Sequence, residues 1–123
     1  MKKITFIGLG VMGFPMAGHL SNKGYKVTVY NRSEEKSKLW IKKYAGNYAT
    51  SINEAVADSD IVFSCVGNDT DLRDITLGRD KAFSGMKADS VFVDHTTTSS
   101  DIAIELSEIA KEYNIHFLDA PVS

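Results

Sequence analysis

The sequence alternates short apolar runs with helix-like stretches along its whole length. Strands that alternate with helices pair in parallel, because each parallel connection must travel back along the sheet through a right-handed crossover. The expected strands lie at residues 3–8, 25–30, 47–50, 61–67, 90–94 and 115–119. This pattern predicts the α/β class, a Rossmann-like, doubly wound parallel sheet in a single domain that covers residues 1–123.

The expected helices lie between these strands. The clearest one runs from about residue 99 to 113, with one apolar stripe and with Thr98 and Asp101 as its cap. A short helix from Ser51 carries a capping box with Glu54. The other helices are expected at residues 11–22, from residue 33 onward and at 69–77, with a loop through residues 78–85. Trp40 lies on the helix that begins near residue 33, and we expect it close to the ligand.

The composition excludes several classes of function. The chain has 123 residues, 43% of them hydrophobic and 24% charged, which is typical of one globular domain. Its net charge of −2 offers no basic field for nucleic acid, and no apolar run reaches the roughly 20 residues that span a bilayer. The one cysteine, Cys65, lies in an apolar run and is predicted to be a packed residue. We expect a cytoplasmic protein with neither nucleic-acid nor membrane partners.

The stretch "IGLGVMG" predicts a dinucleotide-binding turn. Gly8, Gly10 and Gly13 form the G-x-G-x-x-G pattern directly after the first strand. The first glycine permits the tight turn, the second lets a pyrophosphate approach the backbone, and the third lets the helix pack on the strand. Free N–H groups at the helix start would then face the diphosphate. The predicted contacts are Gly8, Leu9, Gly10, Val11, Met12 and Gly13.

The end of the second expected strand bears on the choice of cofactor. An NAD site usually places Asp or Glu there to bind the ribose 2′-OH, but this chain has Asn31, Arg32 and Ser33. A guanidinium can bind the 2′-phosphate of NADP, which an acid would repel. We predict that NADP is preferred over NAD, although the adjacent Glu34 and Glu35 argue against it. In the alternative, Arg32 is a solvated surface residue and Ser33 only a helix cap.

Two later strand ends should line the same groove, because ligands of open α/β sheets bind beyond the carboxyl ends of the strands. Val66 and Gly67 follow one strand and are expected on the adenosine or ribose side. Thr96 follows the next strand and is expected near the nicotinamide.

Three ionisable residues at strand ends have two possible roles. His95 has the right ordinary pKa for a general base, but no orienting partner is evident, which favours a structural role. Asp94 and Asp119 could be an acid pair, but hydrogen bonding within turns is favoured. We assign no catalytic residue and no metal ligand within this chain.

Four motifs, in this order, resemble those of the β-hydroxyacid dehydrogenases. They are "GLGVMGFPMAGHL", "CVGND", "VDHTTTS" and the closing "DAPVS". The resemblance covers essentially the whole chain. Within that family, the chain is most similar to the 3-hydroxyisobutyrate dehydrogenases.

The resemblance implies the cofactor-binding domain of a two-domain enzyme. Hydride would pass between the nicotinamide and a small β-hydroxy acid or semialdehyde. Ser123 matches a substrate-binding serine, whereas the family's catalytic lysine and helical second domain would lie beyond it. The isolated chain should then be inactive, expose apolar surface near its last strand and be able to form a homo-oligomer. The alternative is a freestanding NADP(H)-binding or sensing module without catalysis.

Overall fold

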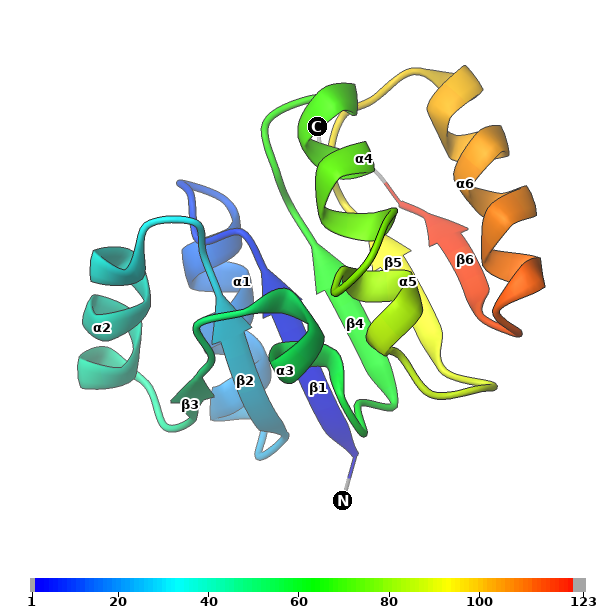
Figure 1. Cartoon of the computed structure of the whole chain (residues 1–123). Coiled ribbons are helices and arrows are strands. Elements are labelled where there is room, and N and C mark those ends of the chain that lie inside the picture. The colour runs from blue at the N-terminus through cyan, green and yellow to red at the C-terminus, as the bar shows by residue number, and fades with distance from the viewer. Residues whose placement is uncertain (1, 121–123) are drawn as a thin grey trace.

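The computed structural model describes residues 2–120 and confirms the predicted fold (Figure 1). Its strands are β1 (Lys3–Ile7), β2 (Lys26–Tyr30), β3 (Asn47–Tyr48), β4 (Ile61–Ser64), β5 (Val91–Asp94) and β6 (His116–Asp119). Its helices are α1 (Gly13–Asn22), α2 (Glu34–Lys43), α3 (Ile52–Val56), α4 (Asp69–Thr76), α5 (Ala82–Gly85) and α6 (Ser100–Glu112). The strands form one sheet in the order β3-β2-β1-β4-β5-β6, and every neighbouring pair is parallel.

The strand order places a crevice between β1 and β4. From β1 the chain adds β2 and β3 on one side, then crosses to the other side of β1 for β4, β5 and β6. At such a switch point the connections after neighbouring strands leave on opposite faces of the sheet, which opens a crevice at the carboxyl ends. The turns after β1 and β4 therefore define where a ligand can bind.

Two apolar clusters hold helices on both faces of the sheet. On one face α3, α4, α5 and α6 pack around Val62, Phe92 and Leu106. On the other face α1 and α2 pack around Phe6, Val29 and Trp40. Figure 1 shows α1 behind β1 and β2, and α4, α5 and α6 in front of β4, β5 and β6. Adjacent side chains of a strand point to opposite faces, so both faces need apolar residues.

The far end of the second face is open. Phe92 and Phe117 belong to the cluster under α6, so their neighbours in β5 and β6 point to the opposite face. There Val91 and Val93 are only half-buried, and Leu118 is 54% exposed. The described residues thus leave apolar surface at the last strand, where the sequence predicted it.

Several local expectations need correction. The first helix begins at Gly13 rather than at residue 11, because residues 10–12 form the turn itself. The expected loop near Gly85 contains the four-residue helix α5, whose Phe83 is buried against Phe92. Helix α6 is capped by Ser99, which accepts a hydrogen bond from the N–H of Ile102, and not by Thr98. Within residues 2–120, no helix has the length and apolar character needed to cross a bilayer.

Candidate functional site

An open groove of about 1310 Å³ lies at the carboxyl ends of β1, β2 and β4. It brings together eleven of the twelve residues that the sequence predicted as cofactor contacts. They are Gly8, Leu9, Gly10, Val11, Met12, Gly13, Asn31, Arg32, Ser33, Val66 and Gly67. The twelfth, Thr96, lies beneath the groove, and Ser123 is outside the described residues.

Two glycines of the turn are required by the protein's own packing. Gly8 has φ +99°, and a Cβ there would collide with the carbonyl of Cys65 at the end of β4. A Cβ on Gly13 would collide with the carbonyl of Gly8 and lie 3.1 Å from the ring of Phe6. These contacts hold the start of α1 tightly against β1.

Gly10 differs from the other two glycines. Its φ is not positive, and a Cβ built there would meet no atom of the described residues within 4 Å, apart from its neighbours in the chain. Neither backbone strain nor packing among the described residues therefore requires glycine at this position. The open space leaves room for a ligand to approach the backbone, as a pyrophosphate does in dinucleotide-binding turns. The groove thus fits the group that the glycine pattern predicted.

Asn31 fixes one wall of the groove to the other. Its Oδ1 accepts a hydrogen bond of 2.8 Å from the N–H of Leu9, and its Nδ2 donates one of 3.1 Å to the carbonyl of Ser33. The N–H of Gly8 also donates to the carbonyl of Tyr30 at 2.9 Å. The glycine turn and the end of β2 therefore form one bonded unit. Sequence reasoning placed Asn31 in the site without finding this role.

The two groups predicted to bind a 2′-phosphate both line the groove. The Arg32 side chain is 82% exposed and forms an ion pair of 3.2 Å with Asp71. Ser33 occupies the N-cap position of α2, but its hydroxyl makes no capping hydrogen bond. The simple cap function that we weighed against cofactor binding is therefore absent. Glu34 instead bonds the hydroxyl of Tyr48 and lies outside the groove lining.

A buried network supports the groove beneath Val66. Oγ1 of Thr96 accepts a 2.9 Å hydrogen bond from the N–H of Val66, and the N–H of Thr96 donates to Oδ1 of Asp94 at 3.0 Å. The same Oδ1 accepts a hydrogen bond of 2.8 Å from the hydroxyl of Ser64. Thr96 is only 2% exposed, so it positions Val66 rather than lining the groove.

Asp94, whose partner across the β5–β6 pair is Asp119, belongs to this network. It is fully buried, and its Oδ2 has no partner among the described residues. Burial raises the pKa of its carboxyl above the ordinary value, and the charge of Asp119 adds to this, while the bonds from Thr96 and Ser64 oppose it. Its hydrogen bond to the N–H of Thr96 agrees with the turn role predicted for it.

His95 and Cys65 have structural surroundings. The ring of His95 stacks on Phe63, with centroids 5.7 Å apart, and its Nδ1 lies 2.7 Å from the carbonyl oxygen of Ala120. Burial, with a smaller effect of the Asp94 charge, raises the pKa of the Cys65 thiol, which disfavours the thiolate nucleophile. His95 agrees with the structural role favoured from sequence, whereas Cys65 packs against the core but is only partly buried and lines the groove.

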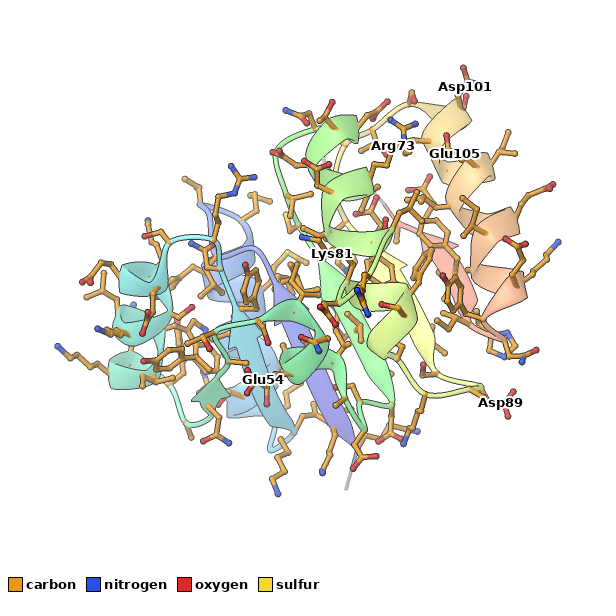
Figure 2. The ribbon with its side chains drawn as sticks, viewed as in Figure 1. Glu54, Arg73, Lys81, Asp89, Asp101 and Glu105 are labelled. Atoms are coloured by element: carbon orange, nitrogen blue, oxygen red, sulfur yellow. The ribbon has the colours of Figure 1, made fainter. Side chains whose placement is uncertain are left out.

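The sequence did not predict that α4 forms part of the groove wall. Asp71, Arg73 and Asp74 all line the groove. The guanidinium of Arg73 is already engaged, because its Nε and Nη2 donate to the carboxylate of Glu105 of α6 at 3.1 and 2.8 Å. Figure 2 shows these two side chains facing each other between the helices. Arg73 is therefore a poorer candidate for binding phosphate. A capping pattern at the start of α4, from Asn68 to Asp71, was the sequence signal available for this wall.

Two further placements matter for experiments. Trp40 is fully buried, with its ring 5.4 Å from that of Tyr44, and does not line the groove, contrary to our expectation. Among residues 2–120, no group of three or more His, Cys, Asp or Glu side chains could hold a metal ion.

The switch-point groove and the glycine turn define the class of dinucleotide-binding α/β domains. Residues 3–123 match the family described as the NAD binding domain of 6-phosphogluconate dehydrogenase, and the chain belongs to this family.

Named relatives agree with this class. An uncharacterised oxidoreductase of Shewanella frigidimarina is 53% identical over the whole chain and is covered to 42% of its own length. The Arabidopsis thaliana protein named "Probable 3-hydroxyisobutyrate dehydrogenase-like 1, mitochondrial" is 43% identical over 98% of this chain, which covers 36% of that protein. The structure of Mycobacterium tuberculosis 3-hydroxyisobutyrate dehydrogenase with L-serine has a TM-score of 0.89 and 28% identity. It covers this chain completely, and the chain covers 41% of it. The chain thus spans less than half the length of these three proteins.

Proposed function

We propose that this chain is the NADP(H)-binding domain of an oxidoreductase that acts on a small β-hydroxy acid or semialdehyde. The observation that carries the proposal is the open space over Gly10, in a turn whose other two glycines are required by packing. Relatives named as oxidoreductases and as 3-hydroxyisobutyrate dehydrogenases support the reaction class. When bound, the nicotinamide cofactor would supply hydride transfer at its C4.

The chain's own residues would bind and orient the cofactor. Backbone N–H groups of the turn at residues 10–12 and of Gly13 at the start of α1 would face the pyrophosphate, since the N–H of Leu9 is already bonded to Asn31. Asn31 would keep this turn against the end of β2, since it bonds both. Val66 and Gly67 would support the adenosine or ribose side, with Thr96 holding Val66 from below.

A preference for NADP rests on charge at the end of β2. Arg32 is exposed and Ser33 has an unused capping hydroxyl, so both groups could bind a 2′-phosphate, Arg32 in exchange for its ion pair with Asp71. The two acids that argued against this preference do not line the groove, and Glu34 is bound to Tyr48 and Lys38. We therefore favour NADP over NAD.

We propose that hydride transfer to substrate needs more protein than these 123 residues. The resemblance places the proton-transferring lysine outside this chain, and the relatives are more than twice its length. Without a positioned proton donor and a wall that excludes water, a bound cofactor would not turn over at an appreciable rate. Ser123 as a substrate contact, a homo-oligomeric state and a cytoplasmic location remain predictions of the same proposal.

Calorimetric titration of the chain with NADPH and NADH tests the binding half of this proposal. We expect both to bind, NADPH more tightly, and Arg32→Ala to weaken NADPH selectively. Lys36→Ala, one turn further along α2 and outside the groove lining, is the matched control and should change neither. Absence of binding by both nucleotides at millimolar concentration would overturn the proposal.

A chimera separates the enzyme from a binding module without catalysis. This chain would replace the matching part of the Shewanella frigidimarina relative, which is 53% identical to it. An oxidoreductase domain should then support NADPH oxidation with small semialdehydes. A folded chimera that binds NADPH but oxidises none of it, while the intact relative does so under the same conditions, would favour the module.

A further inference from the structure

The cation at the end of β2 is bridged across the groove by a carboxylate of α4. Nη2 of Arg32 lies 3.2 Å from Oδ1 of Asp71, although the two residues are 39 positions apart. Both line the groove. The exposures of the two side chains differ, at 82% for Arg32 and 28% for Asp71. The carboxylate is therefore the fixed partner, and the guanidinium is the one that can move toward a ligand.

The helix start, the neighbouring Gly67 and the ion pair with Arg32 together define where the Asp71 carboxylate lies. It is the third residue of α4, and its own N–H donates to Oδ1 of Asn68 at 2.9 Å, which fixes the first turn of the helix. Its Oδ2 lies so close to Gly67 that a Cβ on Gly67 would be 2.7 Å away. Arg32 then approaches the other oxygen. Glycine at position 67 thus leaves room for the carboxylate against the backbone that follows β4.

We propose that Asp71 is a specificity-determining residue that lowers the preference of this groove for NADP. The inference rests on the proposed function. A 2′-phosphate and the Asp71 carboxylate need the same guanidinium, and the two anions repel each other when both are near it. NADP must therefore displace or tolerate Asp71, whereas the neutral 2′-OH of NAD leaves the ion pair intact and can donate a hydrogen bond to a carboxylate.

The ion pair between Arg32 and Asp71 is expected to contribute little to the stability of the fold. An exposed pair of this kind contributes little to the free energy of unfolding, because water screens it and two side chains must be ordered. Asp71 is also the carboxylate of α4 that Arg32 contacts, while Asp74 lines the same groove without forming an ion pair within the described residues. The effect of Asp71 is therefore expected in nucleotide binding rather than in folding.

The test is calorimetric titration of the chain and its Asp71→Asn variant with NADPH and with NADH. Loss of one competing charge should tighten NADPH binding about fivefold and change NADH binding less than about twofold. Asp74→Asn removes the same charge from the same groove without touching Arg32, and should change the NADPH/NADH ratio less than Asp71→Asn does. In an Arg32→Ala background, most of the gain from Asp71→Asn should disappear.

The possible outcomes separate this inference from the proposed function. If the parent chain binds both nucleotides and Asp71→Asn leaves their affinity ratio unchanged or weakens NADPH, the inference fails and the proposed function stands. If the parent chain binds neither nucleotide, both fail. Thermal unfolding shows whether each variant is folded. Asp71→Ser, which also removes the charge but keeps a hydroxyl near Gly67, must give the same direction of change.

Discussion

Oδ1 of Asn31 accepts a 2.8 Å hydrogen bond from the backbone N–H of Leu9, and this bond joins the two walls of the nucleotide groove. Leu9 lies between the first two glycines of the turn, and Asn31 directly follows β2. The amide group of the same side chain donates to the carbonyl of Ser33. One side chain therefore sets the distance between the pyrophosphate turn and the residues expected to bind the ribose.

Replacement of Asn31 tests this role. Asn31→Ala leaves the N–H of Leu9 without its partner, so we expect the free energy of unfolding to fall by about 1 kcal/mol. NADPH and NADH should both bind about tenfold more weakly, which corresponds to about 1.4 kcal/mol. Chemical denaturation and calorimetric titration give the two numbers. Asn31→Asp, which keeps the acceptor and adds a negative charge, should weaken NADPH more than NADH. If Asn31→Asp weakened NADH binding as much as Asn31→Ala does, the hydrogen bond from Leu9 to Oδ1 would not be what positions the turn.

Gly10 and Gly13 should respond to alanine in opposite ways. Gly10→Ala should unfold at the temperature of the parent chain, because its Cβ would meet no other atom of the described residues within 4 Å, yet bind NADPH about tenfold more weakly. Gly13→Ala should lower the free energy of unfolding by about 3 kcal/mol, because its Cβ collides with the carbonyl of Gly8. Thermal unfolding and titration of both variants distinguish the two effects. A Gly10→Ala variant that binds NADPH normally would remove the main support for the pyrophosphate site.

The buried carboxyl of Asp94 predicts a pH dependence of stability. Its pKa is raised by burial, so its contribution to stability is fully present below the unfolded pKa of about 3.9 and is lost as the pH rises through the folded pKa. Asp94→Asn is neutral and keeps the Oδ1 acceptor for Ser64 and Thr96. We expect this variant to be more stable than the parent chain near neutral pH, with the difference shrinking on acidification.

Asp60 provides the opposite control for that measurement. Its pKa is lowered, first by the hydrogen bond from Lys87 and then by the one from the N–H of Lys3. The stabilisation that ionised Asp60 contributes is therefore present above its unfolded pKa and is lost as the pH falls through its folded pKa. Asp60→Asn should therefore be less stable than the parent chain at neutral pH, and the difference should shrink toward low pH. If both variants shift stability in the same direction at neutral pH, the assignment for Asp94 is wrong.

Replacement of Thr96 should lower the free energy of unfolding, because its side chain is buried and does not line the groove. Thr96→Val removes the acceptor of the Val66 N–H and should cost about 1–3 kcal/mol of unfolding free energy, because the site is buried. Thr96→Ser keeps the hydroxyl and should retain most of the stability. Denaturation curves of both variants test this. A valine variant as stable as the parent chain would show that the bond to Val66 is unimportant.

The 123-residue chain should bind NADPH without oxidising it. Small semialdehydes added to the chain with NADPH should give no absorbance loss above the background without protein, since no proton donor is assigned within it. A semialdehyde that the intact Shewanella frigidimarina relative reduces with NADPH under the same conditions serves as the positive control. A steady-state rate that scales with the concentration of this chain would contradict the proposal.

The sequence alone determined the fold class, the position of every strand and most of the groove. Parallel pairing follows from the alternation of strands and helices, and the glycine spacing follows from the geometry of a turn between β1 and α1. Both are local patterns, so a single sequence carries them. For the same reason, the residues after β1, β2 and β4 were found as groove-lining before the structure was known.

Only the tertiary structure decided which side chains meet across the groove. Arg32 and Asp71 are 39 residues apart, Asn31 and Leu9 are 22 apart, and no local pattern links either pair. Thr96 was expected in the groove but lies beneath it, because the loop after β5 bonds to Val66. Trp40 was expected near the ligand but lies in the core, because α2 packs against distant parts of the chain. The structure also showed that a Cβ on Gly10, unlike one on Gly8 or Gly13, would meet no other atom of the described residues within 4 Å. Periodicity and spacing report on neighbours along the chain, whereas contacts between elements depend on how the whole sheet is assembled.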